Sequence, residues 1–254
     1  MTTKLLFFFC CLLFISCQDD EKFQVLQPLG GQVITGYIPC TSLELGILGS
    51  EALEVKGGGD WTVVSNDESV VKAEKVIPES ASYSYLSISP MQQGKAVVTV
   101  TGDAGDKINI PVSVGVSVRT LTVLGELNHI EGVSKEDSTL IVEHLYDDVF
   151  IRERGWYRLT YSEKRNGKLI VESFEGKKEE GTFSSGDGCY DFTFGGKCVH
   201  YMIMYNTQGT QMETRMEQRL PFYLVEDVTD RYQTNYPTIK LVQRAQKVRI
   251  SDNN

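Results

Sequence analysis

Short runs in which apolar and polar residues alternate, separated by turn signals, cover most of this chain. The clearest run is residues 108–118, where every second residue is Ile or Val, and residues 96–100 repeat the pattern. Turn signals rich in Gly, Asn and Asp stand between the runs, for example at residues 57–60 and 102–105. A period of two places neighbouring side chains on opposite faces of a strand, so we expect a mostly β fold.

The first part of the chain, residues 23–116, predicts a sandwich of two sheets. About seven short strands in ~95 residues is the density typical of that architecture. Pro111 falls among the outward positions of its strand and has no N–H to donate, which favours a strand at the edge of a sheet.

Several segments of this part resemble a group 2 bacterial immunoglobulin-like domain. Residues 53–55, 57–63, 65–66 and 70–71 look like its first half, and residues 94–101 look like its closing strand. The resemblance implies an immunoglobulin-like β-sandwich, and members of that family mostly serve as spacers or adhesion modules on bacterial surfaces.

Trp61 stands at the start of a strand in this part and has two interpretations. An exposed indole would offer a stacking surface for a sugar, whereas a buried one would pack against Val63 and Val71. The family pattern places a buried aromatic here, so we expect Trp61 in the core.

The first sixteen residues predict an export signal. Lys4 supplies a positive start, and the apolar run at residues 5–15 is shorter than the ~20 residues that a membrane-spanning helix needs. Residues 14–17 (Phe-Ile-Ser-Cys) resemble a lipobox, which implies cleavage before Cys17 and attachment of lipid to that cysteine. The alternative is an ordinary signal peptide with a coincidental cysteine.

An acidic segment follows Cys17. Residues 18–21 (Gln-Asp-Asp-Glu) resemble the surface-export signal of Bacteroidetes-type lipoproteins, so we expect residues 17–22 to form a tether. Solvated acids stay out of the bilayer and hold the folded part away from it. The resemblance implies an outer-membrane protein that faces the cell exterior and has the membrane as a partner through Cys17.

The charge balance excludes some partners. The chain has 25 Lys and Arg against 34 Asp and Glu, a formal net charge of −9. Binding to nucleic acid needs Lys and Arg to neutralise phosphates, so we expect no nucleic-acid partner. The same balance disfavours adsorption to an anionic membrane surface.

The cysteines do not predict a disulfide scaffold. Three remain beyond Cys17, namely Cys40, Cys189 and Cys198, and no CxxC spacing suggests a zinc site. A tight turn at residues 195–196 would place Cys198 opposite Thr193, about four residues along the strand from Cys189 and beyond disulfide reach at ~3.3 Å per residue. A longer turn would allow the bridge, so both alternatives stay open.

The remaining residues, 117–254, predict a β-rich domain with one or two short helices. The strongest hairpin signal is Asn166-Gly167, which as a two-residue turn would place Leu159 opposite Phe174 and Arg158 opposite Glu175. We recognise no family resemblance in this part.

Two segments of this domain have helical signals. Ser134 begins a capping box, followed by apolar residues at helical spacing as far as Leu145. A shorter helix is expected from Asp227, ended by Pro237.

A search for catalytic motifs finds none. No G-x-S-x-G occurs, and the glycines at 57–59 lead into a strand and not into a phosphate-binding helix. The best cluster for metal or acid–base chemistry is Glu143-His144 with Asp147-Asp148, because His144 shares a helix face with the two aspartates. A third ligand is missing there, and charged residues near a helix end are usually just solvated.

The other two histidines, His129 and His200, are expected to be structural polar residues. Paired carboxylates for glycoside hydrolysis meet in space, so sequence alone leaves them open. We expect no catalytic, metal or cofactor site and no enzymatic activity.

Aromatic residues are dense in the second domain. Some could form a glycan-binding platform, although a β-rich core also uses aromatic side chains. The set comprises Trp156, Tyr157, Tyr190, Tyr201, Tyr205, Phe222, Tyr223, Tyr232 and Tyr236.

Taken together, these features predict a non-enzymatic surface lipoprotein for adhesion or binding of a glycan or protein ligand, with the first domain presenting the second. The alternatives are a structural accessory subunit or spacer of an outer-membrane complex and, last, a hydrolase with its site hidden in the second domain.

Overall fold

The computed structural model describes residues 22–29, 36–79, 83–205 and 221–253. Strands predominate in these residues, and α1 (Lys135–His144) is their one α-helix, which confirms the prediction of a mostly β fold. No helix in the described ranges has the length and apolar character needed to cross a membrane. The predicted signal peptide, Cys17 and the tether up to residue 21 lie outside the described residues.

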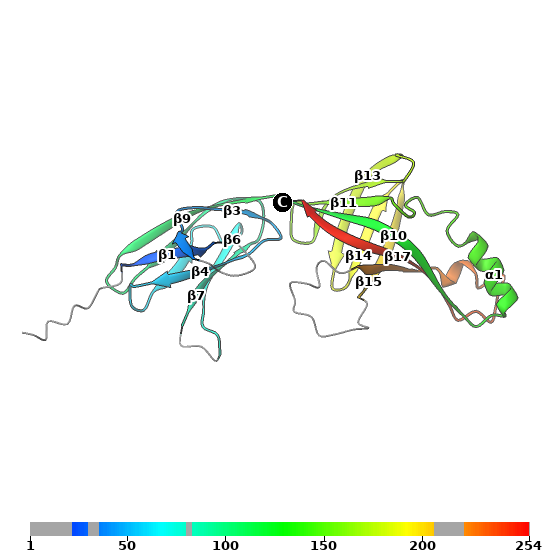
Figure 1. The fold of residues 1–254 in the computed structure, drawn as a ribbon, viewed down its shortest axis with the longest axis horizontal. Coiled ribbons are helices and arrows are strands. Elements are labelled where there is room, and N and C mark those ends of the chain that lie inside the picture. Colours follow the sequence, from blue (N-terminus) through cyan, green and yellow to red (C-terminus); the bar gives the residue numbers. More distant parts are fainter. Residues whose placement is uncertain (1–21, 30–35, 80–82, 206–220, 254) are drawn as a thin grey trace, which may run out of the picture.

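The first nine strands form two sheets (Figure 1). One sheet has the order β2-β1-β4-β7-β6, from β1 (Gln24–Pro28), β2 (Tyr37–Pro39), β4 (Glu51–Lys56), β6 (Val71–Val76) and β7 (Tyr85–Pro90). The other has the order β3-β9-β8-β5, from β3 (Leu43–Gly46), β5 (Thr62–Ser65), β8 (Gly94–Thr101) and β9 (Lys107–Gly115). All of these neighbouring strands are antiparallel except β3 and β9, which are parallel.

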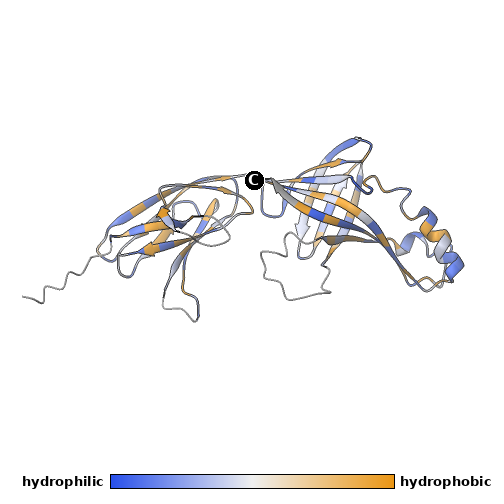
Figure 2. Cartoon of the chain, in the orientation of Figure 1, coloured by the Kyte–Doolittle hydropathy of each residue, from blue (hydrophilic) through white to orange (hydrophobic). Residues whose placement is uncertain are grey.

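The alternation in sequence explains how these sheets bury their inner faces. Val98 and Val100 of β8 are fully buried, as are Leu86 and Ile88 of β7 in the other sheet, and all four belong to one apolar cluster. Trp61 is buried in the same cluster, with the Lys75 ammonium 4.8 Å from its ring centroid, so the prediction of a core position is confirmed. Figure 2 shows apolar and polar residues alternating along the strands of both parts of the chain.

Pro111 lies on β9, between β3 and β8, and not on an edge strand as predicted. Its partner Val97 directs both its N–H and its C=O to Asn66, away from β9, so the nitrogen of Pro111 points away from β8. Pairing of β9 with β3 begins only at Val112. The missing N–H of Pro111 therefore faces a position with no partner strand, which is why a proline is tolerated there.

The second part of the chain is a closed antiparallel barrel, an architecture that the sequence did not predict. Each strand pairs with the next along the chain, and the last strand, β17, pairs back with the first, β10, from Val118↔Asn253 to Glu131↔Leu241. The strands are β10 (Ser117–Glu131), β11 (Trp156–Tyr161), β12 (Asn166–Glu172), β13 (Lys178–Gly186), β14 (Cys189–Phe194), β15 (Lys197–Tyr205), β16 (Phe222–Asp227) and β17 (Leu241–Asn253).

Aromatic side chains fill the barrel, as expected for an eight-stranded barrel whose interior is just wide enough for side chains. Their ring centroids lie 4.7–6.4 Å apart in tilted or edge-on pairs, which aromatic quadrupoles favour. The members of this group are Tyr157, Tyr161, Phe183, Tyr190, Phe192 and Tyr201. Much of the aromatic density seen in the sequence is therefore core.

The hairpin β11–β12 has a register different from the predicted one. Leu159 pairs with Leu169 and Arg158 with Ile170, and the turn lies at residues 162–165. Gly167 lies inside β12, where a Cβ would collide with the carbonyl oxygen of Thr160 and the ring of Phe183. Gly167 allows the neighbouring strands to approach closely and does not form a turn, so the prediction of a turn at Asn166-Gly167 was wrong.

The helix signals have two different outcomes. Helix α1 is capped as predicted, because the Ser134 hydroxyl accepts a hydrogen bond of 3.1 Å from the Asp137 N–H. The second helix is shorter than predicted and is a single 3₁₀ turn, η1 (Thr229–Arg231). Just before this turn, the Asp227 carboxylate accepts a hydrogen bond of 2.9 Å from the Thr229 N–H.

The structure decides between the two alternatives for Cys189 and Cys198. Thr193 pairs with Cys198 across a tight β14–β15 turn, as the shorter-turn alternative predicts, and Cys189 pairs with Met202. Cys40, Cys189 and Cys198 are free thiols in the part of the chain that the structure describes.

The two parts of the chain contact each other at one end of the barrel. Gln92, in the β7–β8 turn, forms a β-bridge with Glu163 in the β11–β12 turn. The Gln93 side chain also donates to the Ser162 carbonyl at 3.4 Å. Because β10 begins directly after β9, the other end of the barrel faces away from the first part (Figure 1).

Candidate functional site at the open end of the barrel

A half-open cleft of about 1200 Å³ lies at the end of the barrel that faces away from the first part of the chain. Three connections form its walls: the segment 147–153 between α1 and β11, the β12–β13 turn and the β14–β15 turn. Side chains of β16 and β17 close the remaining side. Loops at the mouth of a barrel on a rigid scaffold are a common location for ligand sites.

Apolar and aromatic residues line the inner part of the cleft. Tyr157 and Ile151 are fully buried there, and Phe150 and Phe194 have ring centroids 6.2 Å apart. Burial raises the pKa of Tyr201, which also lines the cleft, to about 12, so this phenol stays protonated at neutral pH.

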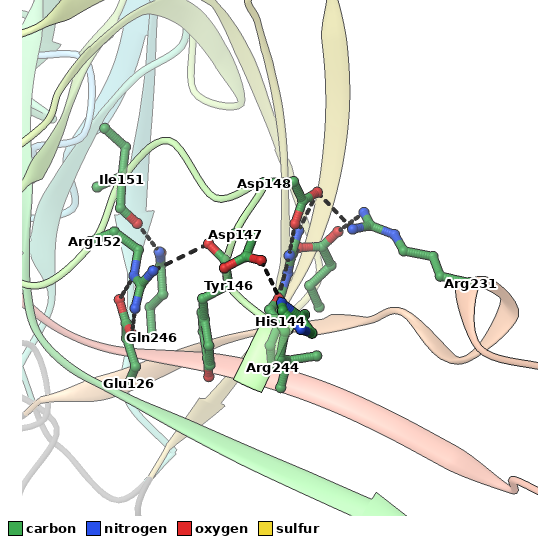
Figure 3. Close-up of polar contacts among 12 residues, drawn as sticks. Glu126, His144, Tyr146, Asp147, Asp148, Ile151, Arg152, Arg231, Arg244 and Gln246 are labelled. Carbon is green, nitrogen blue, oxygen red and sulfur yellow. Dashed lines mark hydrogen bonds and ion pairs between the residues drawn. The ribbon is translucent and has the colours of Figure 1, made fainter. Parts of the chain in front are cut away.

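A buried ion pair lies beside this apolar surface, and Figure 3 shows the contact of its arginine, Arg244, with Asp148. The Arg244 Nε donates a hydrogen bond of 2.7 Å to Glu226, and the two side chains are 7% and 9% exposed. The other end of the Arg244 guanidinium donates to Asp148 at 2.5 Å and to the Leu145 carbonyl at 2.9 Å. Arg244 thus ties β16 and β17 to the segment after α1.

Arg231 completes the group. It donates to Asp148 at 2.7 Å and to Glu226 at 3.0 Å, so two arginines face two carboxylates and the charges balance. This balance is what makes burial of the charged Arg244 and Glu226 tolerable, since an unpartnered buried charge would be costly. We call Asp148, Glu226, Arg231 and Arg244 the ion cluster.

The pKa of Asp148 reflects these contacts. Burial alone would raise the pKa, but the hydrogen bonds and charges of Arg244 and Arg231 outweigh it and lower the pKa to about 2. For Arg244, burial would lower the pKa, and the contacts with Asp148 and Glu226 outweigh this and raise it. Asp148 and Arg244 therefore stay ionised across the physiological range.

Hydrogen bonds between neutral groups and one ion pair lie under the cleft. The Tyr157 hydroxyl donates to the Gln246 side-chain oxygen at 2.7 Å, and the Gln246 amide donates to the Ile151 carbonyl at 2.5 Å. Glu126 of β10 pairs with Arg152, which also donates to the Tyr146 carbonyl at 3.2 Å. The segment that forms one wall of the cleft is thus fixed to β10 and β17.

Phe174 lies at the rim of the cleft and is 64% exposed. The Arg154 guanidinium lies 5.3 Å from its ring centroid. Arg154 has a φ of 70°, and it is the one non-glycine residue with positive φ in the described ranges. This left-handed conformation costs an arginine about 1 kcal/mol or more, and such strain clusters at binding sites.

The residues singled out from sequence are only partly brought together. His144 Nδ1 lies 2.9 Å from Asp147, as the helix spacing predicts, and both side chains are mostly exposed. Asp148 instead joins the ion cluster, and no group of three metal-ligating side chains occurs in the part of the chain that the structure describes. His129 and His200 each have a single acidic partner, Glu131 at 2.7 Å and Asp191 at 2.6 Å.

The ion cluster was missed, although the sequence has a signal for it. In β17 the buried positions are Val242, Arg244, Gln246 and Val248, so the period of two places an arginine and a glutamine on the inward face. Glu226 follows Phe222 and Leu224 with the same phase in β16. A charge at an inward position indicates a buried partner of opposite sign.

Comparisons with known proteins identify no family for this chain and only distant structural similarity. No family model matches this chain, and no curated protein matches it. Among solved structures, domains 5-6 of the S-layer protein SbsC are similar with a TM-score of 0.26 and 10% identity, over 88% of this chain and 85% of that one. Domains 4-9 of SbsC are similar with a TM-score of 0.25 and 9% identity, over 82% of this chain and 26% of that one. At such low TM-scores, neither fold nor function is transferred from SbsC.

Proposed function

We propose that this chain is a non-enzymatic lipoprotein of the cell surface that binds a ligand in the cleft at the open end of its barrel. The observation that carries the proposal is the cleft itself, about 1200 Å³ in volume, with an apolar inner part and fixed polar groups beside it. Concave sites that combine apolar lining with a few placed polar groups are typical of ligand binding.

The chemistry of the cleft supports binding more than catalysis. A general acid that works near neutral pH needs a carboxyl group whose pKa is raised, whereas the pKa of Asp148 is lowered to about 2. The arginines of the ion cluster are held by its carboxylates. These groups are fixed in place, as binding sites require, and none is an activated nucleophile.

The first part of the chain, residues 23–116, is then a group 2 immunoglobulin-like β-sandwich that acts as a spacer. Two sheets around one core with Trp61 buried between strands support this assignment. The cleft lies at the far end of the barrel from this part, so lipid on Cys17 at the other end of the chain would hold the cleft away from the outer membrane.

The second candidate is a structural accessory subunit. The contacts of Gln92 with Glu163 and of Gln93 with Ser162 favour it, because they join the two parts into one extended unit. A spacer of this kind needs no ligand of its own, and its cleft would have no function.

Binding by the detergent-solubilised chain to panels of oligosaccharides and peptides tests the proposal. We expect a ligand whose binding is weakened by Arg231→Gln and unchanged by Arg165→Gln, which removes an exposed ion pair with Asp187 in the turn regions at the opposite end. The panel compounds should be recovered intact. Cleavage of a compound would contradict the non-enzymatic assignment. Binding that Arg231→Gln leaves unchanged would show that the site lies outside the cleft. If no compound binds, the structural candidate is favoured.

A further inference from the structure

Most of the basic groups that line the cleft are already paired with acids. Seven acidic and five basic side chains line it, and four of the basic groups, Arg152, Arg231, Arg244 and Lys177, are each paired with a carboxylate. Among the described residues only the fifth, Lys197, has no such ion pair, so an anionic ligand would find one cation, would otherwise have to break pairs, and would meet an excess of acids. The balance therefore disfavours phosphates, sulfates and carboxylates as ligands.

The ion cluster nevertheless presents polar atoms to the cleft. Asp148 is 43% exposed and Arg231 47%, so both reach solvent while their partners Arg244 and Glu226 hold them in place. A carboxylate only accepts hydrogen bonds and a guanidinium only donates them. A hydroxyl group does both, so neighbouring hydroxyls suit a fixed pair of one acceptor and one donor.

Phe174 supplies an apolar ring at the rim. Arg154 lies over this ring at 5.3 Å in a strained backbone conformation, and the ring is still 64% exposed. In the described ranges, the exposed aromatic side chains are Phe174, Tyr37, Tyr83 and Tyr205, and of these only Phe174 lines the cleft. A flat ring exposed beside hydrogen-bonding groups suits a ligand with one apolar face and a polar edge.

The size of the cleft points to an extended ligand. Its volume of about 1200 Å³ exceeds the roughly 300–1,000 Å³ of pockets for small molecules, and the cleft is half-open to solvent. A ligand made of several linked rings can lie across such a cleft, whereas a single small molecule would leave much of the cleft filled with water.

From these observations we infer that the ligand is an uncharged oligosaccharide chain, stacked on Phe174 and hydrogen-bonded through its hydroxyls to Asp148 and Arg231. This inference rests on the proposed function and names the ligand class for the same cleft. Sugar rings have an apolar C–H face and an edge of hydroxyls that both donate and accept, which is the combination that the cleft offers.

The test is binding of the detergent-solubilised full chain to an array of uncharged and charged oligosaccharides, followed by calorimetric titration with the strongest uncharged one. Phe174→Ala should weaken that binding about tenfold, the loss expected for one aromatic stacking contact. The matched control is Tyr205→Ala, which removes a ring of similar exposure (61%) at the opposite end of β15 and should leave the affinity unchanged. Arg231→Gln against Arg165→Gln gives a second matched pair.

The outcomes separate this inference from the proposed function. Binding of an uncharged oligosaccharide that Phe174→Ala weakens about tenfold and Tyr205→Ala leaves unchanged supports both. Cleft-dependent binding of only charged glycans, or of only peptides, overturns the ligand class and leaves the proposed function standing. Silence of the wild-type chain on glycan and peptide panels alike overturns both, and binding of uncharged glycans that neither cleft variant weakens overturns the site.

Discussion

Arg244 donates a hydrogen bond of 2.7 Å to Glu226 in the barrel, where neither side chain is more than a tenth exposed. The pair joins the two strands β16 and β17, and Asp148 holds the other end of the same guanidinium at 2.5 Å. The stability of the barrel near the cleft therefore depends on a small set of charges that must all be present together.

Removing Arg244 should destabilise the chain strongly. Arg244→Met leaves Glu226 buried with only Arg231 as a partner, so we expect the free energy of unfolding to fall by about 3–5 kcal/mol. Chemical denaturation measures this loss. Adding Glu226→Leu should restore part of it, because the uncompensated charge is then gone, while Arg165→Gln alone should change stability by less than about 1 kcal/mol. A mild effect of Arg244→Met would contradict the burial of the pair.

Ionisation of Asp148 should make the free energy of unfolding depend on pH only at acid pH. Its pKa is lowered from 3.8 to about 2, so the ionised form stabilises the fold; the contribution is complete well above pH 4 and is lost as pH falls through 2. Because the side chain is 43% exposed, solvent screening reduces the contribution to about 1 kcal/mol. Unfolding of the wild type and Asp148→Asn, measured from pH 6 to pH 2, should show a difference that shrinks toward pH 2. A constant difference would contradict this assignment.

Gly167 should not tolerate a side chain. A methyl group there would meet the Thr160 carbonyl and the Phe183 ring, so Gly167→Ala should lower the free energy of unfolding by about 1–3 kcal/mol. Gly125 of β10 is the control, since nothing lies within 4 Å of a Cβ there, and Gly125→Ala should leave stability unchanged or slightly raised. Equal effects of the two substitutions in a thermal melt would show that strand approach at Gly167 is not limiting.

Two of the three thiols, Cys198 and Cys40, should differ in reactivity. Cys198 is exposed and should react with iodoacetamide in the native chain. Cys40 is buried, and burial together with the nearby charge of Glu51 raises the pKa of its thiol, so it should react only after unfolding. Mass spectrometry of labelled peptides distinguishes the two. Rapid labelling of Cys40 in the native chain would contradict its place in the core of the first part.

Lipid attachment is testable by fractionation. Cys17→Ser should release the protein from the membrane fraction, because the predicted thioether to lipid cannot form on serine. Cys10→Ser keeps Cys17 and is the matched control within the same signal segment. Continued membrane attachment of Cys17→Ser would refute the lipoprotein assignment.

The strand periodicity and the Ser134 cap were predicted from sequence because they depend on contacts within a few residues. The pairing of Thr193 with Cys198 was one of two alternatives that the sequence left open. Closure of the barrel does not, since β10 pairs with β17 across most of the second part of the chain, and alternation is the same in open and closed sheets.

The candidate site was predictable in part. The inward phase of Glu226 and Arg244 indicates that buried charges exist, but not that Asp148 and Arg231 meet them from two separate connections. Asp148 looked like a partner of His144 because helix spacing was extended past the end of α1, where the chain turns. The interpretation of Asn166-Gly167 failed for a similar reason, since one glycine can serve either a turn or a close approach.

The pairing of β10 with β17 also determines when, during synthesis of the chain, the barrel can close. A nascent chain that has been made only as far as β16 has two strand edges with unpaired N–H and C=O groups, and neither edge can find its partner until β17 is present. The barrel is therefore completed only after β17, its last strand, has been synthesised. Until then its aromatic interior is accessible to chaperones and to other chains, so completion of the barrel competes with aggregation of the open sheet.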